Sequence, residues 1–237
     1  MNLEVLTDAA AVARRAARLV AAEARAAVAA RGRFNMAVSG GHTPWVMLRA
    51  LAGEALPWEH VHVLQVDERV APAGHPDRNL THLCESLKQA PLRLEQLHSM
   101  PVEEKDLAAG AASYARVLQE LAGVPSALDL AHLGLGPDGH TASLVPGDPA
   151  LAISDTDVAV TGIYQGRRRM TLTYPVLNRA RRILWVVTGA EKADMLLRLR
   201  AGDESIPAGR VRREQALVLA DQAAAGQLAA EYQRGSG

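Results

Sequence analysis

The chain has 237 residues, of which 49% are hydrophobic and 22% are charged, a balance typical of a globular protein with a substantial core. Lys+Arg and Asp+Glu both number 26, so no net charge draws the protein to nucleic acid or to an anionic membrane. With one cysteine, no Cys/His cluster and no apolar run of about 18 residues, we expect no disulfide, metal site or membrane span, and a cytoplasmic location.

Helical and strand patterns alternate along the chain. An amphipathic helix is predicted over residues 8–30, a buried strand over 34–39 and a helix from Trp45 to about Ala52. Further strands are predicted over 61–66, 128–136, 183–189 and 216–221, with helices over 108–123 and 190–202. Cys84 falls in another amphipathic pattern, where we expect an inert packing residue.

This alternation predicts a doubly wound, mainly parallel α/β sheet flanked by helices. The sequence has no repeat, low-complexity linker or break in composition, so we expect residues 1–237 to form a single domain. In such sheets ligands bind beyond the carboxyl ends of the strands. The residues that follow each strand are therefore the candidates for a functional site.

The first candidate is Ser39-Gly40-Gly41-His42-Thr43-Pro44, after the strand over 34–39. The two glycines permit a tight turn, while Thr43 as N-cap and Pro44 as the first helical residue would begin the next helix. Free amides at that helix terminus then form an anion site. No Gly-Lys-Ser/Thr follows, so this is not a nucleotide P-loop, and a plain strand–helix turn with a solvated or packed His42 remains the alternative.

Charged residues after later strands are the next candidates. Asp67-Glu68-Arg69 follow the strand over 61–66, where a surface salt-bridge cluster or an anion-binding Arg69 would both fit. Arg169 and Lys192 either face a ligand or are solvated surface charges. Arg167 and Arg168 are expected to be exposed.

The segment LGLGPDGHTASLVPGDP (133–149) contains a G-x-G-x-x-G pattern after a predicted strand. A dinucleotide site would require a long helix and another strand next, but prolines and a glycine at 146–149 interrupt the chain. We therefore favour a loop that exposes Asp138 and His140. Histidine exchanges protons near neutral pH, and although a lone histidine is more often structural, this position between glycines favours a general base.

Five segments together resemble the 6-phosphogluconolactonase family: MAVSGGHTP, VDERVAPAGHPDRN, LGLGPDGHTASLVPG, RRMTLTYPVLNRA and VTGAEKADML. The resemblance extends from about residue 30 to the last predicted strand. It implies a Rossmann-like α/β fold and hydrolysis of 6-phospho-D-glucono-1,5-lactone to 6-phosphogluconate in the pentose phosphate pathway, with no metal or cofactor. The implied partner is this small-molecule lactone, and we expect a monomer or a weak homo-oligomer.

The resemblance also implies roles for single residues. His140 matches the catalytic histidine, and Asp67 and Arg69 match the DER at the second strand end. Asp138 would orient or stabilise the imidazole, and Arg69 or a backbone amide would stabilise the oxyanion. The implied phosphate-binding residues are Gly40, Gly41, Thr43, Arg169 and Lys192. The family commonly has a serine where this chain has Arg78, which puts a hydroxyl contact there in doubt.

Two other functions fit part of the pattern. Glucosamine-6-phosphate deaminases of this fold have GHIAFNEP where this chain has GHTASLVP, so Val145 replaces a glutamate that cooperates with the histidine in ring opening. Valine cannot relay a proton. A non-catalytic sugar-phosphate sensor would keep the cations and could dispense with His140. No G-x-S-x-G elbow offers a nucleophilic serine, so we expect direct attack by water.

Overall fold

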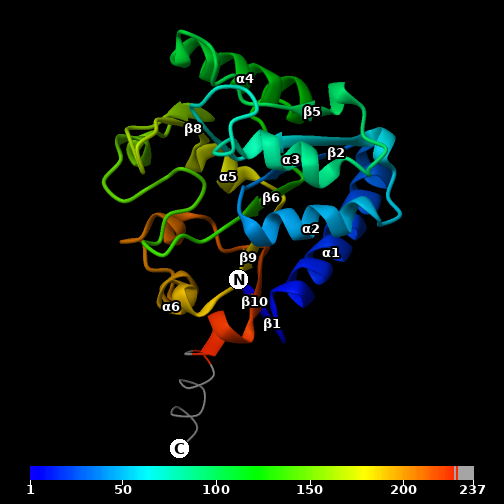
Figure 1. Cartoon of the computed structure of the whole chain (residues 1–237), viewed down its shortest axis with the longest axis vertical. Helices are drawn as coiled ribbons and strands as arrows, with labels where there is room; N and C mark the ends of the chain where they lie inside the picture. Colours follow the sequence, from blue (N-terminus) through cyan, green and yellow to red (C-terminus); the bar gives the residue numbers. More distant parts are fainter. Residues whose placement is uncertain (227, 229–237) are drawn as a thin grey trace, which may run out of the picture.

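A seven-stranded parallel sheet forms the centre of the computed structural model, which describes residues 1–226 and 228 (Figure 1). From edge to edge the strands are β1 (Asn2–Leu6), β10 (Ala216–Asp221), β9 (Arg182–Val187), β6 (Leu130–Leu133), β2 (Phe34–Val38), β3 (Val61–Gln65) and β5 (Leu97–His98). Every neighbouring pair is parallel. The predicted doubly wound, parallel α/β fold is confirmed.

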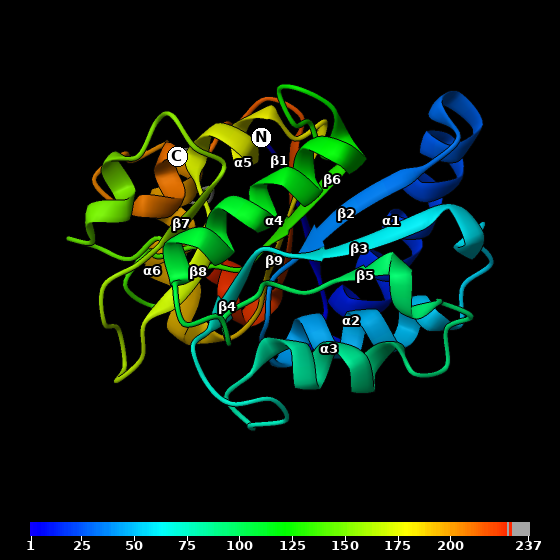
Figure 2. The ribbon, with the colours of Figure 1, turned by 90° about the horizontal axis from the view of Figure 1, so that it is seen from above.

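Helices cover both faces of this sheet (Figure 2). One face carries α1 (Ala9–Arg31), α2 (His42–Ala52) and α3 (Asn79–Leu87). The other carries α4 (Leu107–Ala122), α5 (Tyr174–Arg179) and α6 (Ala193–Ala201). Strands covered on both sides are mostly apolar, and all five residues of β2 are buried, the polar Asn35 among them. Within the described residues, no helix has the length and apolarity needed to span a membrane.

The order of the strands determines where a ligand can approach. The chain runs outward from β2 through β3 to β5, then returns to place β6 on the other side of β2 and continues through β9 to β10. The winding direction therefore reverses between β2 and β6. The loops that leave these two strands diverge at their carboxyl ends and open a crevice, the usual ligand position in this fold class.

A second, three-stranded antiparallel sheet lies beside the main one, in the order β4 (Asp67–Arg69), β8 (Arg169–Leu172) and β7 (Val158–Val160). Asp67–Arg69, which follow the predicted strand over 61–66, form a strand of their own by pairing with β8. Arg69 lies opposite Arg169 in this pairing. This strand was not predicted for two reasons. Its side chains are polar, and its partner strand lies about a hundred residues further along the chain.

The remaining predicted elements are present with shifted ends, but the surroundings of Cys84 were wrongly predicted. Cys84 lies on α3, as expected, yet it is exposed and does not serve as a packing residue. The buried residues of α3 are Asn79, Leu83, Ser86 and Leu87, at helical spacing, and Cys84 is not among them. The edge strands β1 and β5 were not predicted from the sequence.

Candidate functional site

A cavity of about 520 Å³ lies at the carboxyl ends of the parallel strands. Its wall includes eight of the nine predicted site residues: Gly40, Gly41, Thr43, Asp67, Arg69, His140, Arg169 and Lys192. They come from the loops after β2, β6 and β9 and from the small sheet. The ninth, Asp138, lies behind the imidazole of His140. The structure thus brings together residues that are 152 positions apart in the sequence, from Gly40 to Lys192.

Asp138 and His140 form a hydrogen-bonded pair. Nδ1 of His140 lies 2.5 Å from Oδ1 of Asp138, and the backbone N–H of His140 donates to the same oxygen at 3.1 Å. Burial opposes ionisation of Asp138, but the charge and hydrogen bonds of His140 and a hydrogen bond from Tyr164 outweigh it, so the pKa of Asp138 lies below its usual value. An ionised carboxylate only accepts hydrogen bonds, so Nδ1 carries the proton and Nε2 is left as the basic nitrogen.

Gly136 makes room for this imidazole. A Cβ at Gly136 would lie 2.1 Å from Nδ1 of His140, closer than any side chain tolerates. The loop is closed by hydrogen bonds from Gly136 N to His140 O at 2.8 Å and from Gly139 N to Gly136 O at 3.1 Å. The G-x-G-x-x-G pattern therefore folds the chain around a histidine side chain, as the interruption at 146–149 indicated.

Tyr164, which the sequence analysis missed, completes this group. Its hydroxyl donates to Oδ2 of Asp138 at 3.0 Å, and its ring lies edge-on to the His140 ring with centroids 5.5 Å apart. The guanidinium carbon of Arg169 lies 4.9 Å from the centroid of the same ring. A cation at this distance over an aromatic face is attracted to it. Tyr164 therefore joins the Asp138–His140 pair to Arg169.

The segment after β2 begins α2 with free backbone donors, but not with the predicted cap. The N-cap is Gly41, at φ 128°, and no side chain caps the helix. Thr43 lies inside the first turn, and its hydroxyl pairs with that of Thr188 at 2.7 Å across the cavity wall. A Cβ at Gly40 would fall 2.1 Å from Oδ1 of Asn79, so this glycine permits close contact between two loops. An uncapped helix terminus at a cavity favours an anion there.

Asp67 and Arg69 project from β4 into the cavity wall. Asp67 accepts from the Ser143 hydroxyl at 2.5 Å and from Nδ2 of Asn79 at 3.3 Å. Nη1 of Arg69 donates to Oδ1 of Asn79 and to the carbonyl of Asp77, both at 3.0 Å. Among the described residues, Nε of Arg69 has no hydrogen-bond partner. This arginine is held in place in the wall of the cavity, where its positive charge lies beside the space that a ligand would occupy.

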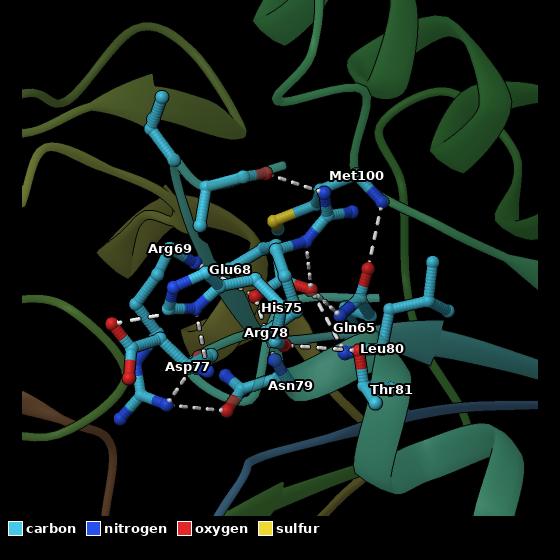
Figure 3. A network of polar contacts seen from close by, with 12 residues as sticks. Gln65, Glu68, Arg69, His75, Asp77, Arg78, Asn79, Leu80, Thr81 and Met100 are labelled. Carbon is cyan, nitrogen blue, oxygen red and sulfur yellow. Dashed lines mark hydrogen bonds and ion pairs between the residues drawn. The ribbon is translucent and has the colours of Figure 1, made fainter. Parts of the chain in front are cut away.

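Glu68, the middle residue of this strand, is fully buried and serves the fold (Figure 3). It accepts hydrogen bonds from Nε2 of Gln65 and from the backbone N–H groups of Asn79 and Leu80, each at 2.8 Å. Nε of the buried Arg78 lies 3.1 Å from Oε2 of Glu68. The alternative of a surface salt-bridge cluster was therefore wrong. Arg78 makes a structural ion pair, so it offers no substrate contact in place of a serine hydroxyl.

Arg169 and Lys192 reach the cavity from opposite sides. Arg169, 4% exposed, begins β8, and Lys192 ends the turn between β9 and α6. Burial and the nearby Arg69 lower the pKa of Arg169, opposed by the charge of Asp67, and Nε of Arg169 has no partner within the described residues. A buried cation beside a second cation favours a bound anion. Arg167, expected to be exposed, is half-buried and pairs with Asp77 at 2.6 Å.

Three other functional candidates emerged only from the structure. Ser143 and Asn79 hold Asp67, and Asp221 at the end of β10 accepts from the N–H of Gly189 at 3.1 Å. Their roles depend on partners far away in the sequence, although Asn79 and Ser143 both lie within segments that carry the family resemblance. Within residues 1–226 and 228, no three His, Cys, Asp or Glu side chains are arranged to hold a metal ion.

Comparisons with known proteins agree on one family. The family model for glucosamine-6-phosphate isomerases and 6-phosphogluconolactonases matches residues 7–219. A 6-phosphogluconolactonase from Nostoc sp. is 36% identical over 233 residues, which cover 95% of this chain and 97% of the relative.

Solved structures extend the agreement to the fold. The 6-phosphogluconolactonase of Trypanosoma brucei is 22% identical with a TM-score of 0.85, covering 96% of this chain and 98% of that one. A monomeric glucosamine-6-phosphate deaminase is 19% identical with a TM-score of 0.81, covering 95% and 99%. The backbone fold alone therefore does not separate the two activities, and the side chains of the site have to do so.

Proposed function

The chain belongs to the family of glucosamine-6-phosphate isomerases and 6-phosphogluconolactonases, and on this premise we propose that it hydrolyses 6-phospho-D-glucono-1,5-lactone to 6-phosphogluconate. The observation that carries the proposal is the Asp138–His140 pair in the wall of a cavity that also contains three cationic side chains, Arg69, Arg169 and Lys192. A base beside an anion-binding surface is what hydrolysis of a phosphorylated ester requires.

The anion-binding part of the cavity orients the substrate. We assign the 6-phosphate to Gly40, Gly41, Thr43, Arg169 and Lys192, because a dianion gains charge-assisted hydrogen bonds from cations and from an uncapped helix terminus. Fixing the phosphate brings the lactone carbonyl beside His140. Positioning of this kind supplies much of an enzyme's advantage over the reaction in water.

The chemistry proceeds by general base and then general acid catalysis at one imidazole. Nε2 of His140 accepts a proton from water as the water oxygen bonds to C1 and the carbonyl electrons move to oxygen. The tetrahedral intermediate collapses, the bond from C1 to the ring oxygen breaks, and the imidazolium returns the proton to that oxygen. The product carries a carboxylic acid and a hydroxyl, and the acid then loses its proton to solvent to give the carboxylate. Such proton transfer contributes about 10²–10⁴-fold to rate.

Two groups assist these steps. Asp138 orients the imidazole through Nδ1 and stabilises its charged form. Arg69, whose positive charge lies in the cavity wall, stabilises the oxyanion. Asp67 is already engaged by Ser143 and Asn79, which leaves His140 as the better placed base. The scheme uses no cofactor or metal.

A lactonase fits this chain better than a deaminase. Val145 is 5% exposed and apolar, and it stands where the deaminases have a glutamate. The chain therefore lacks one proton carrier for ring opening at the corresponding position. For the enzyme as a whole we propose one domain over residues 1–237, a cytoplasmic location and a monomer or weak homo-oligomer.

The test is an assay of freshly prepared 6-phosphoglucono-1,5-lactone, followed by proton release and corrected for spontaneous hydrolysis. The same preparation is tested with glucosamine 6-phosphate for ammonia release. We expect saturable acceleration of lactone hydrolysis and no ammonia. Ammonia release would establish the deaminase instead, and saturable binding of 6-phosphogluconate without turnover of either compound would establish a sensor.

A further inference from the structure

The hairpin between β7 and β8 holds Tyr164 rigidly. Tyr164 and Arg167 exchange backbone hydrogen bonds, with N···O distances of 2.9 and 3.3 Å. Gln165 and Gly166 between them have φ angles of 52° and 78°. Two successive residues with positive φ define the tight turn that suits a two-residue hairpin. The turn sequence Tyr-Gln-Gly-Arg thus fixes the direction in which Tyr164 leaves the backbone.

Hydrogen bonds of the Arg167 side chain connect this hairpin to the loop between β4 and α3. Nε of Arg167 donates to Oδ2 of Asp77 at 2.6 Å, and its Nη1 contacts the carbonyl of Val70 at 3.4 Å. Within the hairpin, Nη2 of Arg169 donates to Oε1 of Gln165 at 3.1 Å. The position of Tyr164 is therefore set by contacts on both sides of the turn.

From this position Tyr164 touches both functional parts of the cavity. Its hydroxyl donates to Asp138, its edge faces His140 and its face meets Arg169. Burial, the hydrogen bond to Asp138 and the charge of Asp138 raise the pKa of Tyr164, while the charge of Arg169 opposes this, so the hydroxyl keeps its proton. Tyr164 therefore remains a donor at the pH at which the enzyme works.

We propose that Tyr164 is a positioning residue with two separable parts: its hydroxyl holds Asp138 in the orientation that directs Nε2 of His140 into the cavity, and its ring holds the guanidinium of Arg169 where the substrate phosphate binds. The proposal rests on the proposed lactonase function. Without the hydroxyl, Oδ2 of Asp138 loses the hydrogen bond from Tyr164. Without the ring, the guanidinium of Arg169 loses the aromatic face against which it packs.

The hydroxyl also reduces the electrostatic effect of the Asp138 carboxylate on His140. A hydrogen bond from Tyr164 spreads the negative charge of Asp138, and its loss would strengthen the attraction of Asp138 for a protonated imidazole. Protonation of His140 would then occur at higher pH. Asp138 and Tyr164 contact His140 directly; the other ionisable groups that line the same cavity are His42, Asp67, Arg69, Arg169, Glu191, Lys192 and Asp221. The test leaves these unchanged.

Tyr164→Phe tests the hydroxyl alone. We expect kcat to fall by about 3- to 10-fold, a part of the general-base contribution, while KM stays within twofold because the phenyl ring still supports Arg169. The acid limb of the kcat/KM profile should move to higher pH by a few tenths of a unit or more. Tyr174→Phe is the matched control, because its hydroxyl donates to the carbonyl of Pro207 at 2.9 Å and Tyr174 does not line the cavity.

Tyr164→Leu tests the ring. Besides the loss in kcat, KM should rise by at least about 2- to 5-fold, which is the value of an exposed cation–π contact and a lower bound for the buried Arg169. Folding of both variants is checked by thermal unfolding. An NMR titration of the His140 ring then reports the shift in protonation without relying on turnover, and the ring signal is identified by its absence in His140→Asn.

A double-mutant cycle separates action through Asp138 from a merely structural role. In an Asp138→Asn background, Tyr164→Phe should change kcat by less than twofold, because the carboxylate that accepts the hydrogen bond from Tyr164 is already absent. The same loss in both backgrounds would overturn the proposal, as would a Tyr164→Phe enzyme that matches wild type in kcat, pH profile and NMR titration. Either result leaves the lactonase assignment intact, whereas a wild-type enzyme that fails to accelerate lactone hydrolysis would overturn that assignment itself.

Discussion

Arg169 lies on β8 and Lys192 lies in the turn after β9, and each is expected to contribute a separate contact to a phosphate dianion. Substitution of either by alanine removes a charge-assisted hydrogen bond, worth about 1.5–3 kcal/mol. KM should therefore rise by about 10- to 100-fold in each variant. Steady-state kinetics on the lactone and calorimetric binding of 6-phosphogluconate measure the effect.

Controls for these two substitutions exist in the chain. Arg168, the exposed neighbour of Arg169, and Lys105, an exposed lysine, do not line the cavity. Alanine at these positions should leave KM unchanged. If Arg169→Ala and Lys192→Ala also left KM and kcat unchanged, both residues would be removed from the phosphate site.

Residue identity could be predicted where a side chain follows a strand end directly. Asp67, Arg69 and His140 met this condition and line one cavity in the structure. Tyr164 did not, because it lies in a turn between two short strands of the small sheet, and only the pairing of β7 with β8 brings it to Asp138. For Arg78 the sequence raised the question of a substrate contact, but the residue has a structural role. Its side chain is buried against the carboxylate of Glu68, ten positions earlier in the chain.

At the scale of elements, the loop between β4 and α3 depends on a buried ion pair. Arg78 contacts Glu68, donates to the carbonyl of Ala71 at 2.9 Å and reaches Glu103 at 2.9 Å. Arg78→Leu would leave the Glu68 carboxylate buried without its cation. We expect a loss of about 3 kcal/mol in the free energy of unfolding, measured by urea denaturation. Arg168→Leu, at an exposed site, should cost less than about 0.5 kcal/mol.

Elements with strong periodicity were predictable, and those made by tertiary pairing were not. The pattern of α1 is repeated over 23 residues, and its ends are marked by Asp8, which accepts from Ala11 N at 2.7 Å, and by Gly32 at φ 75°. β4 and β5 span three and two residues, so no local periodicity could mark them. Thr43 was wrongly predicted as a cap because the helix begins at His42, two residues before the predicted first helical residue, Pro44.

For the whole molecule, the buried His132 on β6 links stability to pH. Burial lowers its pKa from 6.5 to about 4, so the folded protein holds it neutral while the unfolded chain binds a proton. Between these values the unfolded state binds more protons, and stability falls as pH decreases from about 6.5 towards 4. The slope from this group is at most about 1.4 kcal/mol per pH unit, with no further loss below pH 4.

His132→Gln removes this proton exchange. Its free energy of unfolding, measured by urea titration at several pH values between 4 and 7, should depend less on pH than that of the wild type. The half-buried His62 and His98, whose pKa values are also lowered by burial, retain a smaller dependence in both proteins. The exposed His60→Gln is the control, and an unchanged slope in His132→Gln would contradict the assignment.

We assign the role of general base in lactone hydrolysis to His140. His140→Asn keeps a similar size and hydrogen bonding but cannot exchange protons near pH 7. Lactone hydrolysis, followed by proton release and corrected for the spontaneous rate, should show a fall in kcat of about 10²-fold or more, with folding and 6-phosphogluconate binding preserved. Wild-type activity should also fall in acid as the imidazole becomes protonated. Near-normal turnover of His140→Asn with intact product binding would contradict the account, and Asp67 would then be the next base to test.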